Sequence, residues 1–152
     1  MERHGWRLLF YTEFARQRSK LKDAAERAQR KDPLEFASNA NVKLLRAVDR
    51  AMSDVIPQDP SRAEYRQGNT LGRGYRHWRR AKIGRRFRVF FRYDSKAKVI
   101  VYAWMNDERT LRSAGSKADP YTVFAKMLAQ GDPPNDWAAL IAGSAQNPSP
   151  DQ

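Results

Sequence analysis

Apolar and polar positions repeat along the chain with two periods, one typical of strands and one typical of helices. The aromatic and apolar stretch Gly5–Tyr11 predicts a first strand. Helical spacing follows, and Thr12 is placed to cap a helix that runs to about Arg30. The apolar stripe of this predicted helix consists of Phe14, Leu21, Ala25 and Ala28.

A second helix is predicted from a stronger start signal. Asp32 stands where an N-cap is expected, Pro33 takes the first helical position, and Glu35 takes the third. Pro57 is expected to end this helix. Its apolar residues at helical spacing are Ala37, Ala40, Leu44, Leu45, Val48, Ala51, Met52 and Val55. The two helices together predict a hairpin whose apolar stripes belong to the core.

The second half of the chain predicts a small sheet and a closing helix. Residues 57–76 are rich in Gly, Pro, Asn, Asp and Ser and form a long connection. The predicted strands that follow are about His77–Ile83, Arg86–Tyr93 and Lys98–Asn106, with a hairpin turn at residues 94–97. The predicted helices are Tyr121–Gln130, opened by an Asp119-Pro120 cap, and a short one over Asp136–Ala142.

The order of elements predicts an α+β fold with a mainly antiparallel sheet and the helices packed on one face. At 152 residues the chain fits one domain, which we expect over residues 1–142, with residues 143–152 as a disordered tail. There is no cysteine, which excludes disulfides, thiolate metal sites and a cysteine nucleophile. Only two histidines are present, so no metal centre and no other cofactor is expected.

Apolar stretches are too short for a membrane span, which requires roughly 18 residues. The N-terminal residues lack the pattern of a secretory signal, so a cytoplasmic protein is expected.

Positive charge is concentrated in one part of the chain. The net charge is +12, and residues 65–93 carry ten basic side chains, nine of them Arg, and no acidic one. The guanidinium group suits phosphate and stacks on bases, so this bias favours a polyanion, with nucleic acid first. The stretch has a strand and loop pattern, which disfavours a membrane-bound helix. The alternative is that these charges only keep an open sheet face solvated.

Strand alternation predicts which basic residues can act together. Arg80 and Lys82 share one face of their strand, and Arg86 and Arg88 can stand beside them. If the helices cover the opposite face, these cations form a phosphate cradle, and Trp78 and Phe90 offer surfaces for base stacking. Further basic residues and a tyrosine follow the last strand and are expected to fold toward the same basin. These residues are Arg109, Arg112, Lys117 and Tyr121.

Several segments resemble the YhaV toxins of type II toxin–antitoxin systems, which belong to the RelE-like bacterial endoribonucleases. They are Leu71-Gly72, Trp78-Arg79-Arg80-Ala81-Lys82, Arg86-Phe87-Arg88-Val89-Phe90-Phe91-Arg92-Tyr93, Trp104-Met105-Asn106-Asp107-Glu108, Thr110-Leu111-Arg112 and Asp119-Pro120-Tyr121-Thr122-Val123-Phe124-Ala125-Lys126-Met127-Leu128. The resemblance implies a RelE-like fold and an mRNA interferase that cleaves mRNA, including mRNA on the ribosome. It also implies an antitoxin of the PrlF type with a swapped-hairpin DNA-binding domain, so that operator DNA is bound only through the antitoxin.

The resemblance also implies site residues. The matching catalytic positions are Lys82, Arg88, Arg112 and Tyr121, with Arg109 as an alternative to Arg112. The positions expected to bind RNA are Arg80, Arg85, Arg86, Arg92, Lys117 and Trp78. The loop before Tyr121 is longer than in RelE, which leaves open that this tyrosine is a buried anchor of the closing helix.

The expected reaction uses the 2′-hydroxyl of RNA as the nucleophile and needs no metal. Neighbouring cations favour a phenolate over a phenol and a free amine over an ammonium, so Lys82 or Tyr121 is the expected base. Arg88 and Arg112 are expected to hold the phosphate, and Lys117 or a nearby arginine to act as acid. His77 is either a further acid or base or a surface residue.

Two other readings compete with this one. A metal-dependent nuclease would need the carboxylates Asp94, Asp107, Glu108 and Asp119, but their positions are typical of turns and caps. A non-catalytic RNA- or ribosome-binding protein would use the same basic sheet face without cleaving RNA.

Overall fold

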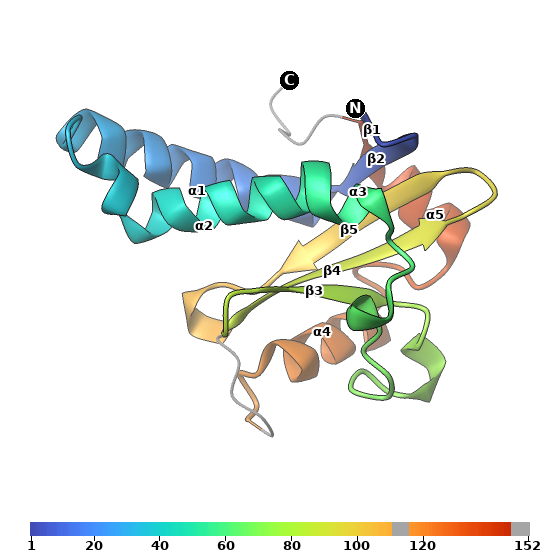
Figure 1. The fold of residues 1–152 in the computed structure, drawn as a ribbon. Coiled ribbons are helices and arrows are strands. Elements are labelled where there is room, and N and C mark those ends of the chain that lie inside the picture. The colour runs from blue at the N-terminus through green and yellow to red at the C-terminus, as the bar shows by residue number, and fades with distance from the viewer. Residues whose placement is uncertain (111–115, 147–152) are drawn as a thin grey trace.

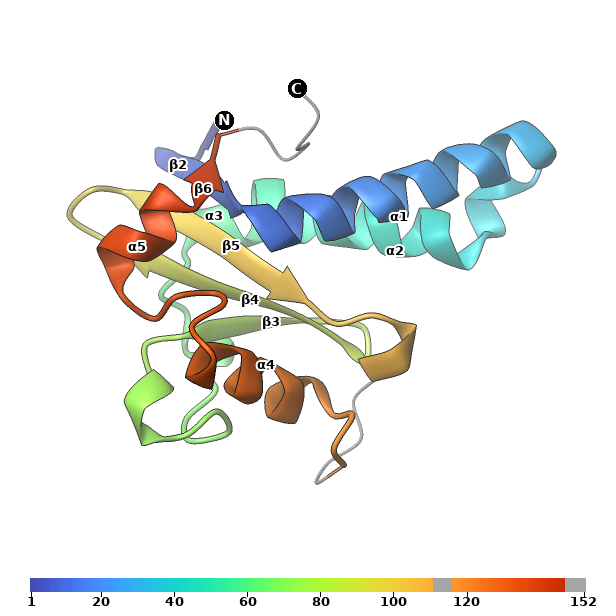
Figure 2. The ribbon, with the colours of Figure 1, turned by 180° about the vertical axis from the view of Figure 1, so that it is seen from behind.

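The computed structural model describes residues 1–110 and 116–146 (Figure 1). It has three layers, with a sheet between a long helical hairpin on one face and shorter C-terminal helices on the other (Figures 1 and 2). The expected α+β class and the mainly antiparallel sheet are confirmed. The expectation that all helices lie on one face is wrong.

The described residues form a six-stranded sheet. The strands are β1 (Glu2–Arg3), β2 (Trp6–Tyr11), β3 (Arg79–Ile83), β4 (Phe87–Asp94), β5 (Val99–Met105) and β6 (Ser144–Ala145). Their order is β1-β2-β5-β4-β3, and β6 also pairs with β2. Only the β2–β5 pair is parallel; the other pairs are antiparallel. This order places β3 at one edge and β4 in the interior of the sheet.

The helices surround this sheet in chain order. They are α1 (Thr12–Lys31), α2 (Ala40–Arg50), the π-helical turn η2 (Ala51–Val55), α3 (Ile56–Gln58), α4 (Pro120–Ala129) and α5 (Trp137–Ala142). Short 3₁₀ turns are η1 (Phe36–Ser38), η3 (Ala63–Tyr65), η4 (Arg73–Tyr75) and η5 (Glu108–Thr110). None of these described helices is long and apolar enough to cross a membrane.

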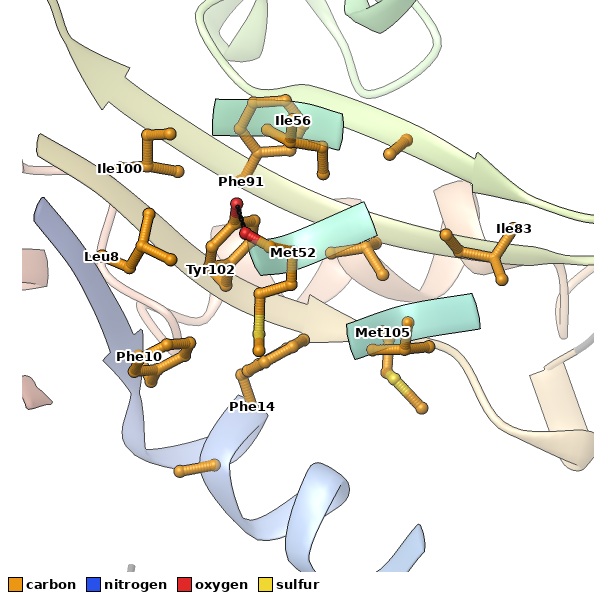
Figure 3. Packing of buried hydrophobic residues seen from close by; sticks show 14 of the residues in the cluster. Leu8, Phe10, Phe14, Met52, Ile56, Ile83, Phe91, Ile100, Tyr102 and Met105 are labelled. Atoms are coloured by element: carbon orange, nitrogen blue, oxygen red, sulfur yellow. Dashed lines mark hydrogen bonds between the residues drawn. The ribbon is translucent and has the colours of Figure 1, made fainter. Parts of the chain in front are cut away.

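The first core lies between the helical hairpin and the sheet (Figure 3). Phe10, Phe14 and Tyr102 pack with ring centroids 5.8–6.2 Å apart. The Tyr102 hydroxyl donates a 2.7 Å hydrogen bond to the carbonyl oxygen of Met52 in η2. Complete burial raises the pKa of Tyr102 well above its usual value. This bond anchors the end of the hairpin on the sheet.

The second core lies on the opposite face, where α4 packs against β3, β4 and β5. Phe124 of α4 stacks on Phe90 at 4.4 Å and on Trp104 at 5.6 Å, and meets Trp78 edge-on at 5.1 Å. The alternation predicted for β3 and β4 is correct, because Ala81 and Val89 face the first core while Trp78 and Phe90 face the second. The face expected to be open is therefore covered by α4.

The hairpin deviates from its predicted boundaries at both ends of the second helix. Asp32 closes α1, because its backbone N–H donates to the carbonyl of Ala28. The actual cap of α2 is Asn39, whose side chain accepts from the backbone N–H groups of Asn41 and Val42. At the other end the helical path continues through Pro57 to Gln58. The widened π turn before Pro57 accommodates the missing N–H of the proline.

The chain ends close to its beginning. Thr12, expected as a cap, is the first helical residue of α1, and its hydroxyl donates to the carbonyl of Gly143. A Cβ at Gly143 would lie 2.8 Å from the Tyr11 ring, so glycine permits this close approach. The region expected to be a disordered tail contains β6, which pairs with β2. Residues 147–152 lie outside the described part of the chain.

Candidate functional site

The hydroxyl of Tyr121 is the centre of the candidate site. Asp119 caps α4 by accepting a 3.2 Å hydrogen bond from the backbone N–H of Tyr121, and Pro120 fits the first helical turn. The Tyr121 ring packs edge-on against Phe90 at 5.6 Å. The side chain is only 6% exposed, so its hydroxyl lies beneath the surface. The cap and the aromatic packing together fix its position at the start of α4.

Two arginines from neighbouring strands converge on this hydroxyl. The Nε of Arg80 donates to the Tyr121 oxygen at 2.8 Å, and the Nε of Arg88 donates to it at 3.3 Å. Arg80 also donates through Nη1 to the carbonyl of Glu64. Arg88 donates through Nη1 to the carbonyls of Arg85 and Phe87, and it is 6% exposed. A single phenolic oxygen therefore orients two guanidinium groups. We define Arg80, Arg88 and Tyr121 as the arginine–tyrosine cluster.

Exposed cations surround the arginine–tyrosine cluster. Lys82 on β3 is directly opposite Arg88 on β4, so the two side chains lie on the same face. Lys82 is exposed, as are Arg85 and Arg86 in the turn between the strands. Gly84 opens this turn at φ +64°, a conformation that favours glycine. The tight turn therefore keeps Arg85 and Arg86 next to Arg88.

Asn106 links the two segments of chain that frame the cluster, and the sequence reasoning did not single it out. Its Oδ1 accepts a 2.6 Å hydrogen bond from the backbone N–H of Arg88. Its Nδ2 donates to the carbonyls of Arg86 at 2.8 Å and Thr110 at 2.9 Å. Asn106 is completely buried, so these bonds form in a region that excludes water. A polar residue directly after an apolar strand was the available signal.

Comparisons with known proteins agree with this geometry. The profile of the YhaV toxin family, described as a toxin with endonuclease activity, of toxin-antitoxin system, matches residues 8–145. The chain belongs to the YhaV toxin family. "Ribonuclease toxin YhaV" of Escherichia coli K12 and "Toxin YhaV" of Escherichia coli O6:H1 are each 43% identical to it over 139 residues. Those residues cover 90% of the chain and 90% of each relative. No solved structure shows a significant match.

The family match extends from β2 to β6 and so includes both helical layers and the arginine–tyrosine cluster. In this YhaV-family chain the cluster unites three of the residues predicted for the site, and Lys82 lies beside them. Arg112, also predicted as catalytic, lies outside the described residues. Its alternative Arg109 is exposed in η5, and Lys117 is exposed shortly before α4.

Two residues predicted to bind RNA have structural roles in this YhaV-family chain. Trp78 is completely buried against Phe124, and its indole N–H donates to the Asn135 side chain at 3.0 Å. The Arg92 guanidinium lies 5.5 Å from the Trp78 ring and 5.2 Å from the Trp137 ring, and donates to the Asn135 carbonyl. Burial lowers the pKa of Arg92. Both predictions are wrong because α4 and the segment around Asn135 cover this face.

His77 belongs to the same structural end of the sheet. Its Nε2 lies 2.7 Å from the Asn135 Oδ1 that also receives the Trp78 N–H. Burial is the main cause that lowers the pKa of His77, and the positive charge of Arg92 adds to it. These contacts assign His77 to the packing around Asn135.

The carboxylates considered for a metal-dependent nuclease are used in turns and caps. Asp94 accepts from the backbone N–H groups of the hairpin turn, Asp107 accepts from the N–H of Arg109, and Asp119 caps α4. Across residues 1–110 and 116–146, no group of three or more His, Asp or Glu side chains is arranged to hold a metal ion. This arrangement gives the metal-dependent alternative no support among the described residues.

Proposed function

We propose that the protein is an endoribonuclease toxin that cleaves mRNA through the 2′-hydroxyl of its substrate and requires no metal ion. The observation that carries this proposal is the convergence of Arg80 and Arg88 on the Tyr121 hydroxyl beside the exposed Lys82. Buried, oriented guanidinium groups are suited to the charge that develops on a phosphate during cleavage. Membership of the YhaV family and a relative named a ribonuclease toxin support the same reaction.

The proposed reaction moves one proton at each end. The free amine of Lys82 removes the proton of the 2′-hydroxyl, and the 2′-oxygen attacks the adjacent phosphorus. Arg88 stabilises the negative charge of the five-coordinate state, with Arg112 as a second phosphate ligand from the segment after β5. The bond to the 5′-oxygen breaks, and that oxygen takes a proton from Lys117. The products are a 2′,3′-cyclic phosphate and a 5′-hydroxyl.

Tyr121 has a different role in this proposal from that of a base. Its hydroxyl is buried and accepts hydrogen bonds from two arginines, which matches the anchor left open by the sequence. We therefore assign Tyr121 as a positioning residue that holds Arg80 and Arg88. Lys82 is the better base because its ammonium is exposed beside Arg88.

The proposed partners follow from the reaction and from family membership. We infer that the toxin acts in the cytoplasm on mRNA, including mRNA on the ribosome, and is inhibited by a PrlF-type antitoxin with a swapped-hairpin DNA-binding domain. Operator DNA is then bound by the complex through the antitoxin. The exposed cations Arg85 and Arg86 guide RNA toward Arg88.

Product analysis of purified protein tests the proposed reaction. Wild-type protein incubated with mRNA in EDTA, with and without ribosomes, is expected to leave 2′,3′-cyclic phosphate or 3′-phosphate ends. Lys82→Met should cleave much more slowly, while Lys96→Met, in the turn between β4 and β5, should not change the rate. Cleavage that occurs only with added Mg²⁺ contradicts the mechanism. RNA binding without cleavage supports the non-catalytic alternative.

A further inference from the structure

The edge of the sheet beside the candidate site is hollowed. β3 is the last strand in the sheet order, and its outer side meets the end of the helical hairpin and η3. A hollow of about 440 Å³ lies there. Its apolar lining comes from η2, α3, η3 and β3, through Ala51, Val55, Ile56, Ala63, Tyr65 and Ala81. The volume falls within the roughly 300–1,000 Å³ typical of small-molecule sites.

The charged groups of this hollow are mostly cationic. Arg66, Arg80 and Lys82 line it, against the single carboxylate of Glu64. The Glu64 carboxylate lies 3.7 Å from Nη1 of Arg62, which partly balances its charge. An apolar lining with three cations matches a ligand that has a flat, weakly polar part and a negative phosphate.

Arg80 connects the hollow to the arginine–tyrosine cluster. Its Nε donates to the Tyr121 hydroxyl, while its Nη1 donates to the carbonyl of Glu64, which lines the hollow. Lys82 lines the hollow as well and is paired with Arg88. A chain with a phosphate at Lys82 and Arg88 therefore has its next residue at the mouth of the hollow.

A second hollow of about 390 Å³, between the hairpin and the end of β5, lacks this charge bias. Its cations Lys20 and Arg109 are matched by the carboxylates of Asp107 and Glu108. Among the described hollows, charge therefore selects the one beside β3 for an anionic ligand.

We propose that the hollow beside β3 binds the base of the nucleotide next to the cleaved bond. This inference rests on the proposed ribonuclease function and adds to it a base-binding site. Such a site would set which base stands beside the cut, because the phosphate contacts alone carry no sequence information.

Filling the hollow tests the inference. Ala63 is exposed in η3, so Ala63→Phe adds a ring to the hollow without disturbing the core. The control is Ala97→Phe, an equal change at an exposed position in the turn between β4 and β5. Cut sites on mRNA are mapped with ribosomes present, and one cut site is then copied into a short RNA. Ala63→Phe is expected to slow cleavage of this RNA about tenfold and to change the base preference at the cut, with Ala97→Phe unchanged.

An abasic RNA separates base binding from other effects. Removing the base on one side of the cut should slow the wild type about as much as Ala63→Phe does, and the two changes together should slow cleavage no further. Arg66→Ala, compared with Arg73→Ala, provides a second variant pair if Ala63→Phe does not fold.

The outcomes separate the two proposals. If the wild type cleaves RNA but Ala63→Phe and Arg66→Ala keep its rate and base preference, the base site is wrong and the nuclease stands. If Ala63→Phe instead loses antitoxin binding at an unchanged cleavage rate, the hollow is a peptide site. If the wild type cleaves no RNA, the nuclease proposal and the inference fall together.

Discussion

Arg88 donates a 3.3 Å hydrogen bond through its Nε to the hydroxyl of Tyr121, and each of the two residues is only 6% exposed. The bond joins β4, in the interior of the sheet, to the first turn of α4. It lies behind the exposed Lys82 rather than in front of it. The pair therefore determines the direction of the guanidinium group, while the surface cations meet the RNA first.

Replacing Tyr121 by phenylalanine tests this arrangement. Tyr121→Phe keeps the ring packed on Phe90 but removes the acceptor of Arg80 and Arg88. Two buried N–H groups then lose a partner, so we expect the free energy of unfolding to fall by about 1–3 kcal/mol. Misplaced guanidinium groups should lower kcat for RNA cleavage by about 10²-fold, with little change in KM.

Single-turnover cleavage and urea unfolding measure both effects. Tyr93→Phe is the control, because its half-buried ring packs on Trp6 in the first core. An unchanged kcat in Tyr121→Phe contradicts the positioning role. A kcat reduced to background, together with an altered pH profile, returns Tyr121 to direct proton transfer.

The meeting of Arg80, Arg88 and Tyr121 could be predicted from the sequence, because alternation fixed the shared strand face and the resemblance supplied the tyrosine. The roles of Trp78 and Arg92 could not be predicted in the same way. Both have the alternation of an exposed basic face, but they are covered by residues more than 30 positions later in the chain. Which face of a strand is covered depends on such distant packing rather than on local pattern.

The helix cap at Asn39 shows a local limit of the same kind. Asp32-Pro33-Leu34-Glu35 has every feature of a helix start, but α1 ends at Lys31 and uses Asp32 for its own termination. Two helix signals only a few residues apart compete, and the chain reversal between them requires the residues that the first signal would use.

Asn106 is predicted to be the residue that sets the distance between β4 and the segment after β5. Asn106→Asp keeps the acceptor for the Arg88 N–H but replaces the two donated bonds to Arg86 and Thr110 by repulsion between oxygens. At a completely buried position we expect a loss of about 3 kcal/mol in the free energy of unfolding. The remaining folded protein should cleave RNA more slowly, because Arg88 shifts relative to its neighbours.

Thermal unfolding and cleavage rates at a temperature where both proteins are folded measure these changes. Asn69→Asp is a matched control, since Asn69 is exposed and only accepts from Arg76 through its side-chain oxygen. Equal unfolding free energies for Asn106→Asp and wild type would show that the three hydrogen bonds carry no stability.

The salt dependence of RNA binding is predicted to report which arginines contact phosphate. Arg86 lies in the turn after β3, beside the cluster, while Arg73 lies in η4 before the start of β3. Each phosphate contact that is lost should flatten the slope of log affinity against log salt by about 0.7 for single-stranded RNA. We expect this change for Arg86→Ala and none for Arg73→Ala, measured by fluorescence anisotropy between low and high salt. Equal slopes for all three proteins would place the RNA elsewhere.

The alkaline limit of stability is predicted to depend on Tyr11. The Tyr11 hydroxyl donates to the Asp132 carboxylate at 2.5 Å, joining the end of β2 to the loop after α4. Partial burial, followed by the hydrogen bond and charge of Asp132, raises the pKa of Tyr11 from 10.0 to about 12. A folded-state pKa above the unfolded one gives stability that is complete below pH 10 and is lost as the pH rises from 10 to 12.

Tyr11→Phe removes this pH-dependent contribution and leaves the ring. Urea unfolding at pH 8 should show a free energy of unfolding lower by roughly 1 kcal/mol in the variant. Between pH 10 and 12 the difference from wild type should shrink toward zero, because deprotonated Tyr11 can no longer donate to Asp132. Other groups that titrate in this range, such as the buried Tyr102, are present in both proteins and cancel in the difference. A difference that stays constant from pH 8 to 12 would show that the hydroxyl contributes through packing alone.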